Sequence, residues 1–362
     1  MGFCRAVLYI FLLYATILAI FLCIPDLQGH LIVLSWVNSP WSTPWLPYKS
    51  WIKQDKIENF YITQGTIKLG AWIIGAPLES LKKGSHVFVY VHGNAKDRSE
   101  FHRTRMYRVL SKLYPVIAFD YSCFADSTCR HSAWLPPTED ELVNDLHIVM
   151  TYLNKKGVLN KDISIISHSL GTGVVSKYLY DYSVKVASVC LMAPMASIPL
   201  AAMDYPAVPL LRPFSLLNHE LQSHIMDLVH MKLNTTFYLP KLNIPIMLVH
   251  GGADNVVPIE HSKILYNAIL GLDYDLSHRG IQLKHLTQQT IMTLFDKREN
   301  KLDWTHAAQE SDSYAYYKKG NVCFLNVKYG MHNDLESFDV FEEYLNEFIY
   351  DTVPIEFEPP TI

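Results

Sequence analysis

The sequence predicts an α/β protein built on a doubly wound, mostly parallel sheet. Short apolar runs rich in β-branched residues recur along the chain, and longer stretches with helical apolar spacing lie between them. Near-continuous apolar runs are typical of parallel strands that are buried on both faces. In sheets of alternating strands and helices, active residues lie at the carboxyl ends of the strands. The predicted strands are 86–91, 115–119, 163–166, 186–191, 246–249 and 322–327, and the predicted helices are 101–113, 139–153, 173–182 and 261–270.

The composition excludes several classes of protein. The chain has 362 residues and a net charge of −4, which gives no electrostatic reason to expect a nucleic-acid partner. Hydrophobic residues make up 49% and charged residues 18%, so most of the chain is not intrinsically disordered. Six cysteines are too few for a disulfide scaffold, and they form no Cys-x-x-Cys pair. We therefore expect a globular body with no metal and no cofactor.

The N-terminal segment predicts a membrane anchor. Residues 6–24 form an uncharged run of 19 residues, long enough as a helix to cross the hydrocarbon of a bilayer. A cleaved signal peptide is the alternative, but its apolar core is about 7–15 residues long and small residues follow it. Arg5 precedes the run and the first Lys after it is Lys49. The positive-inside rule then leaves residues 1–5 in the cytosol and the body in a lumen or outside the cell.

The rest of the chain divides into three kinds of segment. Residues 25–56 are rich in Trp and Pro, which predicts either an interfacial collar or a stiff linker. Residues 57–362 form the main domain, interrupted by two stretches that break the alternation of strands and helices. The first, 197–242, is apolar and contains helical spacing over 219–233; it predicts a cover over the site or a packing subdomain. The second, 271–320, has a polar second half.

A candidate nucleophile follows the predicted strand 163–166. Residues 165–171 read Ile-Ile-Ser-His-Ser-Leu-Gly, which has the form small-x-Ser-x-Gly. The pattern alone is weak, but here a strand precedes the serine and an amphipathic stretch comes after it. That is the strand–turn–helix context of a nucleophile elbow, which lifts a serine hydroxyl above the edge of the sheet. We therefore predict Ser169 as the nucleophile.

A serine nucleophile needs a base to take its proton and a carboxylate to orient that base. Asp254 follows the predicted strand 246–249, and His332 follows the last predicted strand. Both lie in loops at carboxyl ends, in the chain order Ser, Asp, His. We predict these residues as the acid and the base. Weaker alternatives for the acid are Asp204 and Asp334, and His168 and His250 are expected to be structural.

The oxyanion of the tetrahedral intermediate needs amide donors. The amide of Leu170, directly after the nucleophile, is one candidate. The second is the amide of Asn94, because Gly93 lets the loop after strand 86–91 turn toward the site. His92 is expected to brace this loop. Nearby are the basic residues Arg98, Arg103 and Arg105, which we expect on a solvated helix face rather than as a phosphate clamp.

These motifs together resemble the α/β-hydrolase-domain-containing serine hydrolases, in particular the membrane-anchored lysophosphatidylserine lipase and monoacylglycerol lipase group. The matching segments are 59–61, 91–95, 118–121, 167–173, 254–258 and 332–335. The resemblance implies an α/β-hydrolase fold with a lid insertion and hydrolysis of lipid acyl esters in a lumenal or extracellular compartment. It departs from the family at Ser167, where glycine is usual, in the 122–127 loop that we expect to face the pocket, and in the long 271–320 stretch.

Several features leave the function and location open. An acyl-protein or acyl-CoA thioesterase is an alternative activity, and a degenerate, non-catalytic lipid-binding homologue is another. Orientation separates the first from a lumenal lipid hydrolase, because acyl-protein substrates in the cytosol need the opposite topology. The sequon at Asn234 makes it a possible glycosylation site in the endoplasmic reticulum or another endomembrane. Cys123 and Cys129 can form a disulfide in such a compartment. The expected partners are the membrane and a lipid substrate with an acyl chain.

Overall fold

The computed structural model describes residues 2–37, 57–131, 135–204, 224–271 and 308–353. These residues contain a 10-stranded sheet with the order β1-β2-β4-β3-β5-β6-β7-β10-β9-β8. Its strands are β1 (Ile57–Gln64), β2 (Ile67–Ile74), β3 (Val87–Val91), β4 (Val116–Phe119), β5 (Ile163–His168), β6 (Ser188–Met192), β7 (Ile246–Gly251), β8 (Gln309–Glu310), β9 (Tyr314–Lys319) and β10 (Val322–Val327).

The centre of the sheet is parallel, as the sequence predicts. Strands β4, β3, β5, β6, β7 and β10 pair in parallel, and β2 joins β4 antiparallel. All six predicted strands are confirmed. The sequence analysis did not identify the hairpin β1–β2 or the strands β8 and β9, which lie at the two edges and are partly exposed. In β1, β8 and β9 exposed and polar positions interrupt the apolar residues, and in the largely buried β2 Lys68 and Gly70 do so.

Helices cover both faces of this sheet. The α-helices of the described residues are α1 (Gly2–Cys23), α2 (Pro25–Val33), α3 (Phe101–Leu110), α4 (Glu139–Lys155), α5 (Leu170–Asp181), α6 (Ile198–Asp204), α8 (Thr235–Tyr238), α9 (Glu260–Leu270) and α11 (Asp339–Thr352). The four predicted helices are confirmed as α3, α4, α5 and α9. Helices α4, α5 and α9 pack on one face, and α3 and α11 pack on the other.

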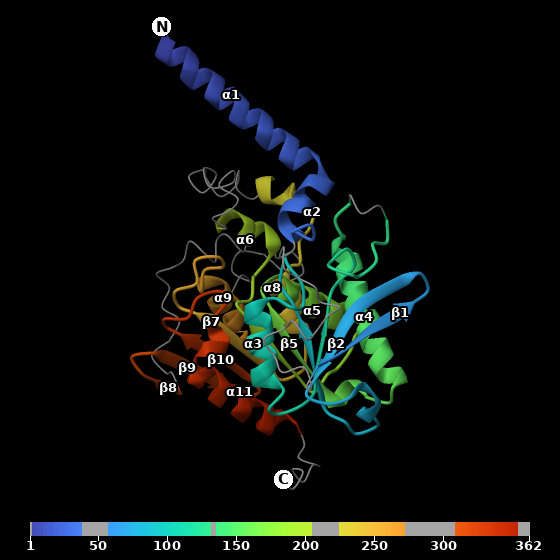
Figure 1. Cartoon of the computed structure of the whole chain (residues 1–362). Coiled ribbons are helices and arrows are strands. Elements are labelled where there is room, and N and C mark those ends of the chain that lie inside the picture. The colour runs from blue at the N-terminus through green and yellow to red at the C-terminus, as the bar shows by residue number, and fades with distance from the viewer. Residues whose placement is uncertain (1, 38–56, 132–134, 205–223, 272–307, 354–362) are drawn as a thin grey trace.

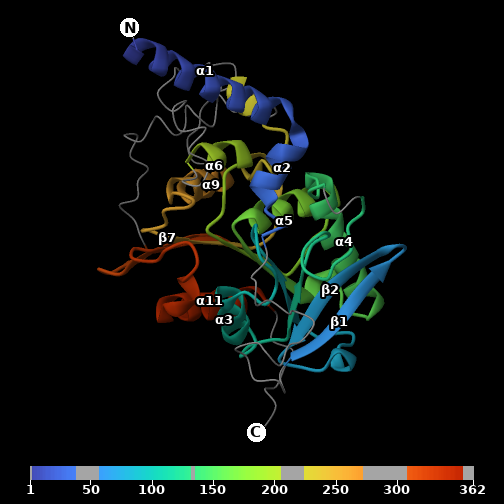
Figure 2. The same cartoon turned by 45° about the horizontal axis from the view of Figure 1, so that its top comes forward.

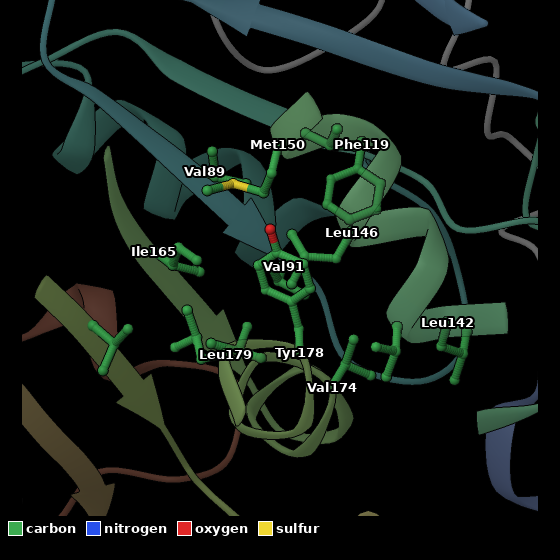
Figure 3. Close-up of a cluster of buried hydrophobic side chains, with 14 of the residues drawn as sticks. Val89, Val91, Phe119, Leu142, Leu146, Met150, Ile165, Val174, Tyr178 and Leu179 are labelled. Atoms are coloured by element: carbon green, nitrogen blue, oxygen red, sulfur yellow. The ribbon is translucent and has the colours of Figure 1, made fainter. Parts of the chain in front are cut away.

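The core on the α4–α5 face shows how the alternation of strand side chains builds two layers. Val89 and Val91 of β3 and Ile165 of β5 point into this cluster, where they meet Leu146 of α4 and Val174 of α5 (Figure 3). The intervening residues of the same strands point into the cluster on the opposite face. Every one of these side chains is fully buried, so each contributes about 1.5–3 kcal/mol of apolar burial.

Helix α1 extends away from this body (Figures 1 and 2). Its Arg5–Cys23 portion is long and apolar enough to cross a membrane, and only 11% of its most apolar window is buried. A core helix of a globular protein would be covered, so its exposed Val, Leu, Ile and Phe side chains point to a lipid or signal-sequence environment. The membrane-spanning prediction therefore has a matching helix.

Part of the predicted juxtamembrane segment packs on the main domain. Residues 25–33 form helix α2, in which Gln28, Gly29 and Val33 are buried. The Trp/Pro-rich residues 38–56 lie outside the described residues, so neither a collar nor a linker is tested. The sequence places the start of the main domain at residue 57, whereas packing against this domain begins at α2.

The predicted helix over 219–233 is wrong in its second half. In the described part of 197–242, helix ends near Leu228 and the chain from Val229 to Leu233 is irregular. The amides of Lys232 and Leu233 both bind the Glu139 carboxylate instead of helical carbonyls. Tertiary hydrogen bonds thus replace the local ones. Residues 205–223 and 272–307 lie outside the described residues, and the end of the 271–320 stretch contributes strands β8 and β9.

A buried ionic cluster fixes the 122–129 loop. The Arg98 guanidinium donates to Asp120, to Asp126 at 2.7 Å and to Asn59 at 2.8 Å, and its side chain is fully buried. Arg98 is therefore not on a solvated face, contrary to expectation. Cys123 and Cys129 form a disulfide within the same loop. None of residues 122–127 lines either of the two cavities that meet at Ser169, which corrects the expectation that this loop faces the pocket.

We predict that Asp120→Asn destabilises the fold by about 3 kcal/mol at pH 7, because it leaves the buried Arg98 charge with one carboxylate fewer. Burial alone would raise the pKa of Asp120, but Arg98 and His92 outweigh this effect and lower it. A carboxyl with a lowered pKa stabilises the fold above the ordinary Asp pKa and loses this contribution as the pH falls below about 4.

The test is urea unfolding of the detergent-solubilised protein at pH 7 and at pH 3.5. The difference between wild type and Asp120→Asn should shrink at the lower pH. The matched control is Asp181→Asn, which breaks a partly exposed pair with Lys177 and should change the unfolding free energy by less than about 1 kcal/mol. A difference that is equal at both pH values would contradict the assignment.

Candidate active site

The turn between β5 and α5 has the geometry of a nucleophile elbow. Ser169 adopts φ 51° and ψ −119°, a left-handed conformation that non-glycine residues rarely hold outside strained functional turns. Gly171 is required here, because a Cβ at this position would lie 2.4 Å from the Val91 carbonyl oxygen. Ser167 is fully buried on β5 and fits where the resembling family has glycine.

Asp254 and His332 meet at the carboxyl ends of two neighbouring strands. Asp254 follows β7 and His332 follows β10, and Nδ1 of His332 lies 2.8 Å from Oδ2 of Asp254. The other carboxylate oxygen of Asp254 accepts the amides of Val256 at 2.8 Å and Val257 at 3.0 Å. Since a carboxylate only accepts, Nδ1 of His332 donates and its Nε2 is left to act as a base.

The surroundings of Asp254 favour its charged form. Burial alone would raise its pKa, but contacts with His250 and His332 outweigh burial and hold the pKa far below its usual range. The ring of His250 lies 3.4 Å from the Asp254 carboxylate and also contacts the Ser262 hydroxyl at 2.6 Å. This supports the expectation that His250 is structural. An ionised Asp254 can orient a histidine and stabilise its protonated state.

His168 connects the elbow to the histidine loop. Its Nε2 lies 2.7 Å from the His332 carbonyl oxygen, so this nitrogen carries the proton. Burial lowers the pKa of His168 to about 3, which keeps the ring neutral. Asp334 accepts the Met331 amide at 2.7 Å and so has a local turn role, as expected. The side chain of Asp204 lies outside the described residues.

Ser169 and His332 line the same cavity. The described residues show no hydrogen bond between Ser169 Oγ and Nε2 of His332. In unliganded enzymes such contacts are often long and tighten only around a substrate. The arrangement therefore brings the three predicted triad residues to one edge of the sheet, with the Asp–His half in direct contact.

The loop from Gly93 to Asp97 is held by the buried guanidinium of Arg103. Its nitrogens donate to the carbonyls of Asn94 at 3.2 Å, Ala95 at 2.8 Å and Asp97 at 2.9 Å, and reach that of Gly93 at 3.5 Å. Because a trans peptide directs its N–H away from its C=O, the contact at the Gly93 carbonyl turns the Asn94 amide away from Arg103. His92 braces the same loop, with Nδ1 2.7 Å from the Gly93 carbonyl oxygen.

Both predicted oxyanion donors border the nucleophile. Asn94, Ser169 and Leu170 line a common cavity. The Leu170 amide is at the first position of α5, where helical amides have no partner inside the helix. No acceptor is recorded for the Asn94 amide in the described part of the chain. Arg103 is thus not on a solvated face, contrary to expectation, whereas Arg105 is partly exposed near Glu336.

Two cavities of different polarity meet at Ser169. The first is apolar and is lined by Leu31, Ile32, Asn94, Ser169, Leu170, Met195, Ile198, Ala201, Ala202, Val256 and Val257. The second has a volume of about 400 Å³ and is of mixed polarity; charged and polar residues in its lining include Lys96, Glu100, His102, Arg103, His168, Ser169, His332 and Asn333, beside the apolar Phe101 and Val256. The site can therefore accommodate an apolar and a polar group on the two sides of one hydroxyl.

Asn234 has a role in the fold. Its Oδ1 accepts the Phe237 amide at 3.3 Å and caps α8, and the sequon residue Thr236 is buried with its hydroxyl bonded to the Ala196 carbonyl. Glycosylation of Asn234 stays a prediction.

Sequence reasoning missed two contributors to the site. The sequence predicts Arg103 on a solvated helix face, because charged side chains are usually exposed, whereas the structure buries it. Leu31 and Ile32 of α2 were assigned outside the main domain. Their apolar character just after the anchor is the signal that could have identified them, but it is equally typical of a membrane interface.

Comparison with known proteins supports the fold and the hydrolase class. A family model described as serine aminopeptidase, S33 matches residues 83–238. The chain is 28% identical to Protein ABHD12B of Homo sapiens over 52% of this chain and 51% of that protein. It is 26% identical to the lysophosphatidylserine lipase ABHD12 of Danio rerio over 73% of this chain and 72% of that protein. The chain thus spans about half the length of the human relative.

Solved structures agree on the architecture. An esterase of Pyrococcus furiosus superposes with a TM-score of 0.56 at 17% identity, covering 88% of this chain and 98% of that one. The esterase Est1E of Butyrivibrio proteoclasticus with bound ferulic acid superposes with a TM-score of 0.54 at 16% identity, covering 81% and 99%. Identities this low establish the fold alone. With the family match and the named relatives, they show that the chain has an α/β-hydrolase fold and support a hydrolase that resembles the ABHD12 group.

Proposed function

We propose that the protein is a membrane-anchored serine hydrolase that cleaves the acyl ester of lysophospholipids, such as lysophosphatidylserine, or of monoacylglycerols. The observation that carries this proposal is the position of Ser169 between an apolar cavity and a cavity of mixed polarity that contains charged side chains. A lipid with one acyl chain has this division, with the ester bond at the junction. The names of the relatives agree, since several are lysophosphatidylserine lipases.

In the proposed mechanism, Ser169, Asp254 and His332 act as a triad. His332 Nε2 takes the proton of Ser169 Oγ as this oxygen attacks the ester carbonyl carbon. The Asn94 and Leu170 amides stabilise the oxyanion. The intermediate then collapses: the ester C–O bond breaks, and the leaving alcohol takes the proton from His332. A water molecule, deprotonated by His332, hydrolyses the acyl-enzyme and regenerates the serine.

The proposed location is an endomembrane such as the endoplasmic reticulum, with the catalytic domain in the lumen. Helix α1 supports anchoring, because Phe21 near its end is buried and the carbonyls of Phe21 and Leu22 accept the side-chain amide of Gln28, which ties the end of α1 to α2. The Cys123–Cys129 disulfide supports an oxidising compartment. The same disulfide disfavours the alternative, an acyl-protein thioesterase, whose substrates would lie in the cytosol.

We predict that Ser169→Ala abolishes labelling by a fluorophosphonate probe and lowers kcat for ester hydrolysis at least about 10³-fold, with little change in stability. Asp254→Asn should lower kcat about 10⁴-fold, because the His332 ring loses its orienting charge. Asp334→Asn is the matched control and should retain activity within about threefold. If Ser169→Ala keeps more than a few per cent of wild-type activity, the nucleophile is another residue.

We predict that kcat/KM rises with acyl-chain length. Each buried methylene contributes about 0.8 kcal/mol, so six additional carbons should raise kcat/KM by about two to three orders of magnitude before a plateau. The measurement is a chain-length series of monoacylglycerols and lysophospholipids on detergent-solubilised protein. A kcat/KM that is flat or falls between about four and sixteen carbons would favour a thioesterase or a non-lipid esterase.

We predict that the native protein carries the Cys123–Cys129 disulfide, whereas Cys190 and Cys323 are free thiols. Both free thiols are buried, and burial raises the pKa of Cys323 to about 12, so alkylation should reach them only after unfolding. Intact mass and peptide mapping after alkylation, with and without glycosidase treatment, report on the disulfide and on Asn234 together. Free thiols at positions 123 and 129 would remove this support for the lumenal location.

A further inference from the structure

Helix α2 and the turn after it lie directly against the loop that carries the proposed oxyanion donor. Asn94 Nδ2 donates to the Ile32 carbonyl at 3.1 Å, the Ala95 amide to the Val33 carbonyl at 3.0 Å, and the Lys96 amide to the Val37 carbonyl at 2.7 Å. The last carbonyls of a helix have no partner inside it. The end of α2 and the loop therefore satisfy each other's backbone groups.

These contacts decide which amide of the loop faces the site. Ala95 and Lys96 both hold left-handed backbone conformations, with φ of 55° and 54°, which persist only where the surroundings fix them. Their amides are committed to α2, and the carbonyls of the loop are committed to Arg103. Of the three backbone amides of residues 94–96, only that of Asn94 has no acceptor among the described residues.

Helix α2 is itself fixed to the body by Gln28, which is almost fully buried. Its Nε2 donates to the carbonyl of Leu228 at 3.0 Å and to that of Phe21 in α1 at 3.1 Å. Its Oε1 accepts the His230 amide at 2.8 Å. Close packing adds to this, since a Cβ on Gly29 would lie 2.6 Å from Cγ of Pro136. A single side chain thus joins the anchor, α2 and the 224–233 segment.

Helix α2 also supplies part of the apolar cavity. The side chains of Leu31 and Ile32 line it together with Met195 and Ile198. In both views α2 lies between α1 and the rest of the body (Figures 1 and 2). The cavity wall is therefore continuous with the helix that we propose as the membrane anchor.

We propose that residues 25–37 contribute to the active site in two ways. Their terminal carbonyls position the oxyanion loop, and the Leu31 and Ile32 side chains determine which acyl chains the enzyme accepts. This inference rests on the proposed function, because both roles are defined by hydrolysis at Ser169. Under this proposal the acyl-binding cavity lies next to the C-terminal end of α1, close to the membrane surface from which a lipid substrate would enter.

The specificity role is tested with Ile32→Trp and Ile32→Ala in the full-length, detergent-solubilised protein, on p-nitrophenyl esters from acetate to palmitate. Both variants keep the Ile32 carbonyl that Asn94 binds. Ile32→Trp should lower the ratio of kcat/KM for palmitate to kcat/KM for acetate at least about tenfold relative to wild type. Ile32→Ala should leave room for longer chains and move the optimum toward them. An unchanged chain-length profile in both variants overturns the specificity role.

The positioning role is tested with Gly29→Ala, whose methyl group must push α2 away from Pro136. Loss of oxyanion stabilisation acts on the transition state more than on the bound substrate. For the acetate ester, kcat should fall about tenfold or more, while KM stays within about twofold. The matched control is Asp26→Asn on the exposed side of the same helix, which should match wild type. A Gly29→Ala variant that melts like wild type and keeps its kcat overturns the positioning role.

A wrong proposed function and a wrong role for α2 predict different experimental results. If wild type shows no hydrolysis that depends on Ser169, the proposed function is wrong and this inference falls with it. If wild type hydrolyses esters but Gly29→Ala and both Ile32 variants behave like Asp26→Asn, only the role of α2 is wrong. Should Gly29→Ala prove unfolded in the melting measurement, Gln28→Glu replaces it, because the acceptor carboxylate cannot donate to Leu228 and Phe21.

Discussion

The buried guanidinium of Arg103 is the contact on which the geometry of the proposed oxyanion site depends. It donates hydrogen bonds to the carbonyls of Asn94, Ala95 and Asp97, which therefore face the same side of the loop. Leaving a buried carbonyl without a donor costs about 1–3 kcal/mol, so the loop cannot turn over without losing several contacts at once. The Asn94 amide shares its peptide with the Gly93 carbonyl, which lies 2.7 Å from His92 Nδ1 and 3.5 Å from Arg103, so His92 and Arg103 together set the direction of this backbone donor.

The order of strands explains why the three proposed catalytic residues are held by different means. Asp254 and His332 leave the neighbouring strands β7 and β10, so a short reach brings them into hydrogen-bond contact. Ser169 leaves β5, with β6 between it and β7. The contact from His168 to the His332 carbonyl spans this gap and ties the elbow to the histidine loop. A neutral, buried His168 suits this role, because a positive charge there would disfavour the protonated state of His332 that the proposed mechanism requires.

Helix α1, the proposed anchor, is joined to the main domain by specific hydrogen bonds. Gln28 of α2 donates to the Phe21 carbonyl of α1 and accepts the His230 amide. Helix α2 in turn binds the oxyanion loop through the Ile32 carbonyl, which accepts Asn94 Nδ2. Under the proposed function, the position of the body relative to the membrane and the geometry of the site therefore share one structural element. This arrangement also gives a physical reason for the irregular course of residues 229–233, whose backbone groups pair with Gln28 and Glu139.

The sequence by itself determined the central sheet, because strands buried on both faces need continuous apolar runs, and such runs are visible without a structure. It also determined the elbow, since Ser169 between a strand and Gly171 leaves few conformations open. Strands β1, β8 and β9 could not be predicted, because exposed positions interrupt their apolar residues. The largely buried β2 was missed because Lys68 and Gly70 interrupt its apolar run. Only the tertiary structure decided the roles of Arg98 and Arg103, whose charges predict solvent exposure until their buried partners are known. The role of α2 also depends on tertiary contacts. Its apolar residues are compatible with a membrane interface and with a cavity wall, and the hydrogen bonds from Asn94, Ala95 and Lys96 to this segment favour the cavity wall.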